Sequence, residues 1–127
     1  AESKCRLSKI FWPSRSERKT TNLLRHNKKV VKNLIGIITG HCLLRRHAKK
    51  LGIVSTDECR YCQDLTCSED IVHLLSECPT LARARFFLWG IPELEEEEMS
   101  KLEIKDILEF IKKLAKIDDS IKEVFPV

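Results

Sequence analysis

Long apolar runs are absent from this sequence, which excludes a membrane-spanning helix of ordinary length. A span needs about 20 consecutive apolar residues. The longest runs here are LIGII at 34–38 and FFLWGI at 86–91, which have the length of core segments. Residues 1–12 also lack the long apolar block and the cleavage pattern of a secretion signal. We therefore expect no contact with membranes and a location inside the cell, in the cytoplasm and the nucleus.

Glycine and proline are scarce, with four of each in 127 residues, and they fall where helices should end. No stretch alternates apolar and polar residues for long enough to predict a strand. A chain of this length is typical of one domain and buries enough surface to fold without disulfides. We predict an all-α fold, a compact bundle of about six short helices. Because the chain starts at Ala1 rather than at a methionine, we also expect a segment of a longer polypeptide.

The single predicted domain, residues 1–127, divides into four segments by composition. They are an irregular basic lead-in at 1–15, basic helices at 16–52, a zinc-site loop with helices at 53–90, and an acidic linker with a C-terminal helix at 91–127. Capping signals predict where the helices begin and end. One helix runs from the N-cap Asn27 to Gly40, a second covers 41–52, and a third runs from Pro79 to Gly90. Two further helices begin at capping boxes, a T-x-x-E box at Thr66 and Glu69 and an S-x-x-E box at Ser100 and Glu103.

Acidic residues are almost missing from the first part of the chain. Residues 1–50 contain 14 Lys and Arg against two Glu, residues 51–92 three against six, and residues 93–127 six against 11, so the net charges are +12, −3 and −5. One interpretation is a solvated basic face that the acidic tail partly neutralises. We favour a contact surface for the phosphates of RNA or DNA, because the charge is confined to one part of the chain. The candidate phosphate-binding residues are Arg15, Arg18, Lys19, Arg25, Lys28, Lys29, Lys32, Arg45, Arg46, Lys49 and Lys50.

Cysteine is the residue type that the sequence has in excess, and four of its six cysteines lie in CRYCQDLTCSEDIVHLLSEC at 59–78. Cys59 and Cys62 form a C-x2-C pair, His73 follows after ten residues, and Cys78 follows after four more. A C-x2-C turn directs two thiolates at one ion, and a histidine and a cysteine from the next helix can complete a tetrahedron. We predict a closed structural Zn²⁺ site with the ligands Cys59, Cys62, His73 and Cys78.

Other roles for the cysteines and histidines are less favoured. Disulfides are disfavoured because the chain lacks a secretory signal, and a redox C-x2-C pair would need a βαβ pattern. Cys67 lies inside the loop and is an alternative ligand, which we interpret as a spectator. His41 is interpreted as a cap at a helix start and His47 as a packing residue between helices, ahead of catalytic or metal roles. The remaining cysteines, Cys5 and Cys42, are interpreted as free thiols, with Cys42 buried.

Three sequence motifs occur in this order: IITGHCLLRRHAKKLGI, CRYC and HLLSECPTLARARF. Together they resemble the C-terminal segment of insect non-LTR retrotransposon polyproteins of the Jockey-like kind. In that family the segment lies downstream of the reverse transcriptase and ribonuclease H domains. The resemblance is clear over 34–90 and looser over 6–33 and 100–115. The matching residues are Thr39, Gly40, His41, His47, Leu51, Gly52, Cys59, Arg60, Cys62, His73, Leu74, Leu75, Cys78, Pro79, Leu81 and Arg85. This sequence departs from the pattern in its longer loop between Cys62 and His73.

This resemblance implies a zinc-bearing accessory domain of a reverse transcriptase that contacts template RNA or target DNA. A copy domesticated by a host would carry the same pattern. Phe11, Trp12 and Tyr61 are candidates for stacking on unpaired bases, although core positions are favoured for Phe11 and Trp12. Ribonuclease H chemistry needs several carboxylates around two metal ions, and residues 1–50 contain only Glu2 and Glu17. No P-loop or nucleophile motif is present, so we expect no enzymatic activity.

A protein-interaction module is the alternative function. Such a module would dock the parent polymerase or a host protein through an apolar groove or through the acidic helix at 101–116, and its binding would depend less on salt. The acidic tail is also a candidate regulator that folds back over the basic face.

Overall fold

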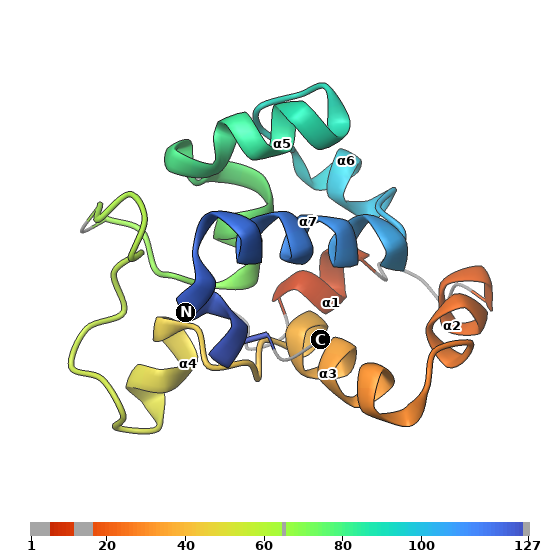
Figure 1. The fold of residues 1–127 in the computed structure, drawn as a ribbon, viewed down its shortest axis with the longest axis horizontal. Helices are drawn as coiled ribbons and strands as arrows, with labels where there is room; N and C mark the ends of the chain where they lie inside the picture. Colours follow the sequence, from red (N-terminus) through yellow and green to blue (C-terminus); the bar gives the residue numbers. More distant parts are fainter. Residues whose placement is uncertain (1–5, 12–16, 65, 126–127) are drawn as a thin grey trace.

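The computed structural model describes residues 6–11, 17–64 and 66–125, and it confirms the all-helical prediction. The α-helices are α1 (Arg6–Phe11), α2 (Glu17–Leu24), α3 (Lys28–Thr39), α4 (Arg45–Lys50), α5 (Ala82–Trp89), α6 (Glu96–Ser100) and α7 (Ile104–Ile117), shown in Figure 1. Shorter turns are the π-helix His73–Glu77 and the 3-10 helices Pro79–Leu81 and Asp119–Glu123. In the described ranges the only β pairing is an isolated antiparallel bridge between Glu58 and Ser68. The seven α-helices of the described residues, most of them short, agree with the predicted bundle of about six short helices.

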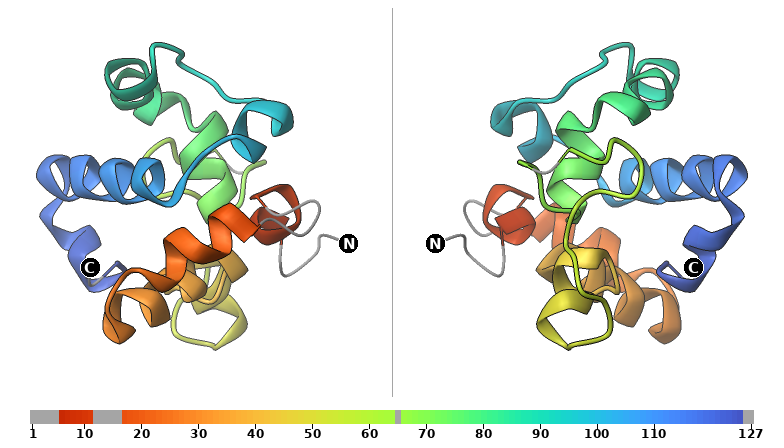
Figure 2. Two further views of the ribbon diagram at one scale, coloured as in Figure 1. Left: turned by 90° about the vertical axis from the view of Figure 1, so that its right-hand side faces the viewer. Right: turned by 90° about the vertical axis from the view of Figure 1, so that its left-hand side faces the viewer.

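α7 crosses the front of the molecule in Figure 1, and the turned views of Figure 2 show it along one side of the fold. Both Figure 1 and the turned views of Figure 2 place α5 on one side of α7 and α3 on the other. α1 contacts both α3 and α6, while α7 contacts α2, α5 and the last 3-10 helix. None of the helices in the described part of the chain has the length and apolar character needed to span a bilayer.

The core forms from apolar residues at helical spacing on α3, α7 and the π-helix. α7 buries Ile107, Phe110, Ile111 and Leu114, which follow the i, i+3, i+4, i+7 spacing of one helix face. These side chains belong to one cluster with residues of α3 and the π-helix, namely Leu34, Ile37, Ile38, Leu74 and Leu75. Each buried side chain of this size contributes about 1.5–3 kcal/mol by leaving water. The cluster also includes Cys59 and Cys78, so the core reaches the predicted metal site.

Four of the predicted helix boundaries are confirmed. Asn27 caps α3 by accepting a 2.9 Å hydrogen bond from the backbone N–H of Val30. Gly40 ends α3 with φ +79°, in the left-handed region that glycine enters at low cost. The helical segment that starts at Pro79 ends at Gly90, which has φ +76°.

The T-x-x-E box at Thr66 and Glu69 is a wrong prediction. The cap is Asp70, whose Oδ1 accepts a 2.7 Å hydrogen bond from the N–H of His73. The N–H and hydroxyl of Thr66 bond to Asp64 instead, at 2.8 Å and 2.7 Å. Glu69 is fully buried against Arg60, and this long-range partner removes it from the capping role.

The S-x-x-E box at Ser100 and Glu103 is also wrong, by one turn. Ser100 ends α6, and α7 begins after Glu103, whose backbone N–H donates to Oδ2 of Asp106 at 2.8 Å. The acidic run before Ser100 forms α6 because carboxylates stabilise the first turn of a helix, and because Met99 is buried in the core.

The helix predicted over 41–52 is shorter than expected. Residues 41–44 are irregular and α4 begins at Arg45. His41 therefore does not cap a helix start. The break lets Leu44 turn into the core, where it is 2 % exposed.

Candidate metal centre

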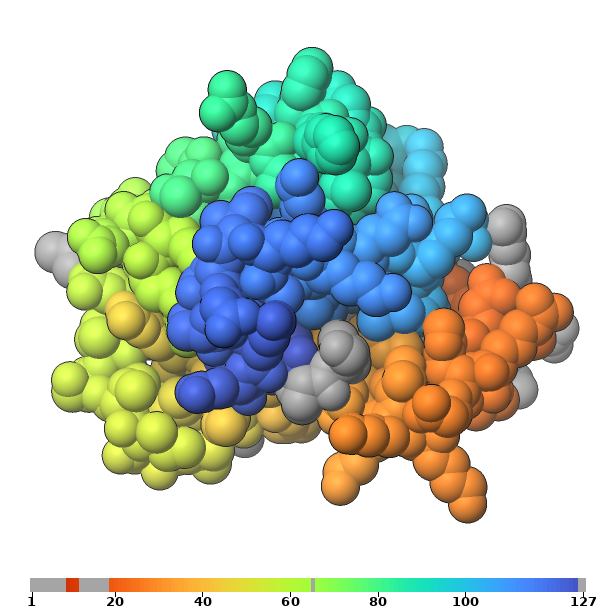
Figure 3. All heavy atoms as spheres, viewed as in Figure 1, coloured from red at the N-terminus to blue at the C-terminus, as the bar shows by residue number. Residues whose placement is uncertain are grey.

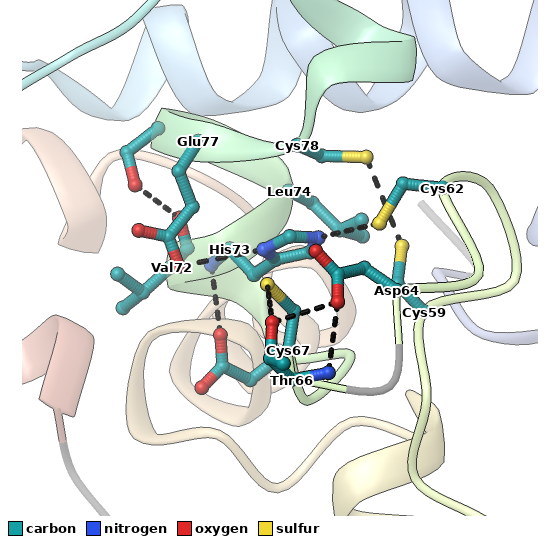
Figure 4. A network of polar contacts seen from close by, with 12 residues as sticks. Cys59, Cys62, Asp64, Thr66, Cys67, Val72, His73, Leu74, Glu77 and Cys78 are labelled. Carbon is teal, nitrogen blue, oxygen red and sulfur yellow. Dashed lines mark hydrogen bonds and ion pairs between the residues drawn. The ribbon is translucent and has the colours of Figure 1, made fainter.

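The structure brings together the four residues that the sequence predicts as metal ligands. One donor atom from each of Cys59, Cys62, His73 and Cys78 lies within 4.8 Å of all the others. The Sγ atoms of Cys59 and Cys78 are 3.7 Å apart, and Sγ of Cys62 is 3.5 Å from Nε2 of His73. Figure 4 shows the two pairs approaching from different segments, one from the loop and one from the helical turn. This group can hold a metal ion.

The first pair is positioned by a tight turn after Cys59. The backbone N–H of Gln63 donates to the carbonyl of Cys59 at 2.8 Å, which closes the turn around the three intervening residues. Gln63 has φ +54°, which is uncommon for a residue with a side chain. The reversal leaves Cys59 fully buried and Cys62 half-buried, with both thiols directed at the site.

The second pair is positioned by the π-helix. In an α-helix, residues five apart point roughly 140° away from each other, so His73 and Cys78 would face different sides. The chain instead forms an i to i+5 hydrogen bond, with the N–H of Cys78 donating to the carbonyl of His73 at 2.8 Å. This wider turn brings the two side chains to the same side. The sequence spacing predicts both ligands but gives no signal for the π geometry.

The orientation of His73 follows from its second ring nitrogen. Nδ1 lies 3.4 Å from Oε1 of Glu77, and the imidazole is 1 % exposed. When the ring is neutral and its proton is on Nδ1, directed at the Glu77 carboxylate, the lone pair of Nε2 faces the thiols, as metal binding requires. A histidine held by a carboxylate in this way is the usual arrangement of a histidine metal ligand.

Without an ion, the four side chains share protons among themselves. Burial opposes protonation of His73, but hydrogen bonds with Cys59 and Cys62 outweigh it and raise the pKa of His73 to about 9. The hydrogen bond between Cys59 and Cys78 raises the pKa of Cys59, with burial adding to the rise, and lowers the pKa of Cys78. A bound cation would take the place of the protons that these side chains hold between them, because thiols lose their protons when they bind a metal.

A buried ion pair braces the Cys59–Cys62 turn. Arg60 binds the carboxylate of Glu69 through Nε at 2.6 Å and through Nη2 at 3.0 Å, and Glu69 is fully buried. The same carboxylate accepts a 2.7 Å hydrogen bond from the backbone N–H of Arg45, at the start of α4. The pair therefore fixes the metal loop against α4.

Arg85 braces the other half of the site, and we missed its role in the sequence. This residue is fully buried, and its guanidinium donates to the carbonyls of Leu74, Cys78 and Pro92 at 2.9, 2.5 and 2.5 Å. The guanidinium thus ties the π-helix to the segment after α5. The available signal was its position, four residues after Leu81 and three before Leu88, on the apolar side of the helix.

The disulfide and redox alternatives receive no support from the described cysteines. Cys42, Cys59, Cys62, Cys67 and Cys78 are free thiols. The 3.7 Å between the Sγ atoms of Cys59 and Cys78 far exceeds the roughly 2.05 Å of a disulfide bond. Cys67 lies outside the four-residue group, with its Sγ 3.9 Å from the hydroxyl of Thr66.

Of the two cysteines predicted as free thiols, Cys42 and Cys5, the structure describes only Cys42. Cys42 is half-buried rather than fully buried. Burial nevertheless raises the pKa of its thiol to about 11. The other thiol, Cys5, lies outside the described residues.

The predicted phosphate-binding residues fall into two classes. Those with exposed side chains are Arg25, Lys28, Lys29, Lys32, Lys49 and Lys50. Three others make contacts that hold the fold. The ammonium of Lys19 contacts the carbonyls of Phe11 and Ser100, Arg46 pairs with Asp70 at 3.0 Å, and Arg45 donates to the carbonyl of Glu58 at 3.3 Å. Arg18 lies within α2, and Arg15 lies outside the described residues.

His41 and His47 contact each other rather than a helix end. Their ring centroids are 5.4 Å apart in an edge-to-face arrangement, and Nδ1 of His41 is 2.9 Å from the hydroxyl of Thr39. A continuous helix would separate residues six apart, and the irregular stretch at 41–44 removes that restriction. Burial, with His41 as a second cause, lowers the pKa of His47.

Comparison of the chain with protein-family models, with curated proteins and with solved structures finds no match. The resemblance to retrotransposon polyproteins therefore stays a prediction from sequence motifs. The features that bear on function are the Cys3His group and the distribution of charged and aromatic side chains around it.

Proposed function

We propose that this protein is a non-catalytic, zinc-stabilised module that binds the phosphate backbone of RNA or DNA. The contact surface is formed by Arg25 in the turn after α2 and by Lys28, Lys29 and Lys32 of α3, here called the α2–α3 basic surface. If the sequence resemblance holds, the parent protein is a retrotransposon reverse transcriptase and this module is its accessory domain. The observation that carries the proposal is four exposed cations close together in the chain, Arg25 in the turn after α2 and three lysines on α3.

Two of the ligand distances fit a tetrahedral ion, and we propose zinc because of the Cys3His donor set. For a tetrahedral ion with Zn–S bonds of about 2.3 Å and a Zn–N bond of about 2.0–2.1 Å, two sulfurs stand roughly 3.8 Å apart, and a sulfur and a nitrogen roughly 3.5–3.6 Å apart. The corresponding distances are 3.7 Å between Cys59 and Cys78 and 3.5 Å between Cys62 and His73. Four protein ligands fill the tetrahedron, which supports a structural rather than a catalytic site.

The buried charges around the ligands also fit a zinc centre. Three thiolates outweigh the charge of one dication, so a Cys3His zinc centre is net negative. Arg85 is the buried cation beside this centre, and its guanidinium bonds to the carbonyl of Cys78 at 2.5 Å. A buried charge is tolerated only where an opposite charge or several hydrogen bonds compensate it.

The electrostatics of α3 favour an anionic partner. Lys28 and Lys29 occupy the first turn, where the helix dipole is positive, and this turn contains no acidic residue. Cations at this end are unfavourable by about 0.3–1 kcal/mol each in the free protein. Residues 18–50 contain ten Lys and Arg and no Asp or Glu. A phosphate at this surface would relieve the repulsion, which supports nucleic acid as the ligand.

The test is the salt dependence of binding to single-stranded RNA and to duplex DNA. The variant Lys28→Glu/Lys29→Glu/Lys32→Glu should lower affinity and reduce the slope of log K against log salt by roughly 2–3, because each lost phosphate contact removes about 0.7–0.9. The matched control is Lys101→Glu/Lys105→Glu/Lys122→Glu, which changes the net charge equally at exposed positions elsewhere. An equal loss in the control, or no loss in the variant, would contradict the α2–α3 basic surface.

A protein-interaction module is the second candidate, and exposed apolar side chains around α4 favour it. Leu43, Leu51 and Ile53 are 45 %, 56 % and 62 % exposed. Apolar surface of this kind often marks a contact with another protein. Binding of the parent polymerase or a host protein through this surface would persist at high salt and would be weakened by Leu51→Ala/Ile53→Ala.

A further inference from the structure

Two phenylalanine rings on α5 are exposed to solvent, which is unusual for large apolar side chains. Phe86 is 60 % exposed and Phe87 is 69 % exposed. Arg83 lies three and four residues before them, so the three side chains share one face of the helix. We call these three residues the α5 aromatic face. Burial of these rings would stabilise the fold, so the folding of this chain does not account for their exposure.

Cations from two helices lie at the α5 aromatic face. The ammonium of Lys113 on α7 lies 4.2 Å from the ring centroid of Phe87, which is a cation–π contact. Arg83, on the same face of α5 as the rings, is exposed, and α5 itself contains no acidic residue. An anionic group bound at the rings would therefore find a cation on α5 and another on α7.

The predicted stacking residues are placed differently. Phe11 is fully buried in the core, and the hydroxyl of Tyr61 donates to Asp118 at 2.9 Å. Trp12 lies outside the described residues. Among the described residues, the exposed phenylalanine rings on α5 are therefore better placed for base stacking than Phe11 or Tyr61.

An unpaired nucleotide matches both features of the face. Its base has a flat π surface that stacks on an aromatic ring, and its phosphate pairs with a nearby cation. Base pairs in a duplex are already stacked on their neighbours and cannot do this. We propose that the α5 aromatic face is a stacking site for single-stranded nucleic acid, an inference that rests on the proposed nucleic-acid binding and adds a second contact to it.

The α5 aromatic face lies apart from the α2–α3 basic surface. In Figures 1 and 2 α7 runs between α5 and α3, and the space-filling view of Figure 3 shows the α7 segment separating the α5 segment from α2 and α3. The two surfaces can therefore be altered independently. A strand that used both would pass over α7.

The experiment measures binding of the full chain to three probes: single-stranded oligothymidylate, an abasic phosphodiester strand of the same length, and duplex DNA. Phe86→Ala/Phe87→Ala should weaken oligothymidylate binding by roughly tenfold and leave the other two affinities unchanged. Phe86→Leu/Phe87→Leu should show the same loss, because leucine is apolar but has no ring. The control Ile117→Ala, which removes a 58 % exposed apolar side chain at the end of α7, should bind like the unaltered chain. Circular dichroism verifies that each variant is folded.

Each contrary outcome has a distinct meaning. Unchanged oligothymidylate binding in Phe86→Ala/Phe87→Ala, or equal losses on all three probes, would overturn the stacking site and leave the proposed function standing. Failure of the unaltered chain to bind any probe would overturn both. Full affinity in the leucine variant would overturn stacking. So would a dimer, seen by sedimentation, that the alanine variant abolishes, because it would assign the face to a second copy of the chain.

Discussion

At the scale of single residues, the candidate metal centre depends on residues with unfavourable local properties, namely a positive φ or a buried charge. Gln63 adopts a positive φ of 54°, and Glu69 and Arg85 are charged residues with fully buried side chains. Each departure is compensated by a contact. The φ of Gln63 closes the turn at Cys62, Glu69 forms an ion pair with Arg60, and Arg85 donates to three carbonyl groups. Strained backbone angles and buried charged side chains occur most often at functional sites in natural proteins.

Arg85 gives the sharpest test at this scale. Arg85→Met keeps most of the side-chain volume but leaves the carbonyls of Leu74, Cys78 and Pro92 without their donor. Each unsatisfied buried acceptor costs about 1–3 kcal/mol. We expect the free energy of unfolding to fall by about 3 kcal/mol or more, measured by denaturant titration of the metal-loaded protein.

The control for this prediction lies on the same helix. Arg83→Met removes an exposed arginine, and we expect a change within about 0.5 kcal/mol. A similar, small effect for both variants would mean that the Arg85 hydrogen bonds contribute little to stability.

At the scale of secondary-structure elements, helix ends were predicted correctly where the cap is local. Asn27 and Gly40 bound α3 because a side chain and a backbone conformation suffice there. The two S/T-x-x-E boxes failed because tertiary contacts selected other residues. Glu69 is committed to Arg60, and α7 begins one turn later than the box predicts, after a turn that buries Leu102.

The start of α7 provides a test of this correction. Asp106→Ala removes the acceptor of the Glu103 N–H at the helix start, and we expect a loss of about 1 kcal/mol in the free energy of unfolding. Ser100→Ala alters the residue that the sequence suggested as the cap, and we expect a change within about 0.5 kcal/mol. Thermal or denaturant unfolding measures both. A larger loss for Ser100→Ala would favour the sequence-based boundary.

At the scale of the whole molecule, the metal site and the core form one structure. The core cluster contains the candidate ligands Cys59 and Cys78 together with α7 residues such as Ile107 and Phe110. The acidic segment belongs to the same cluster, because Leu94, Met99 and Leu102 are buried in it. The segment after residue 93 is therefore not a detachable tail, and its removal would expose the core rather than free a basic face.

Removal of the metal tests this coupling. Purified protein should contain one zinc per chain by elemental analysis, and a strong chelator should abolish much of its helical circular dichroism, because binding energy at such a site is folding energy. Cys78→Ser should lose zinc, whereas Cys67→Ser, which alters a thiol outside the group, should retain it. Metal-free protein with intact helicity would exclude a structural metal site.

The sequence by itself determined the features that depend on near neighbours. Helical periodicity and scarce glycine and proline indicated the all-α class, and the C-x2-C, His73 and Cys78 spacing identified four side chains that the fold brings within 4.8 Å. Such spacings work because the turn and helix that present the ligands are short, local structures.

Only the tertiary structure decided which charged and aromatic groups are available at the surface. Arg46 appeared free in the sequence but pairs with Asp70, 24 residues away, and Lys19 contacts the carbonyl of Ser100, 81 residues away. Phe11 is buried while Phe86 and Phe87 are exposed, although all three are phenylalanines in helices. Burial and long-range pairing are set by how elements pack against each other, and local residue patterns do not encode the positions of distant partners.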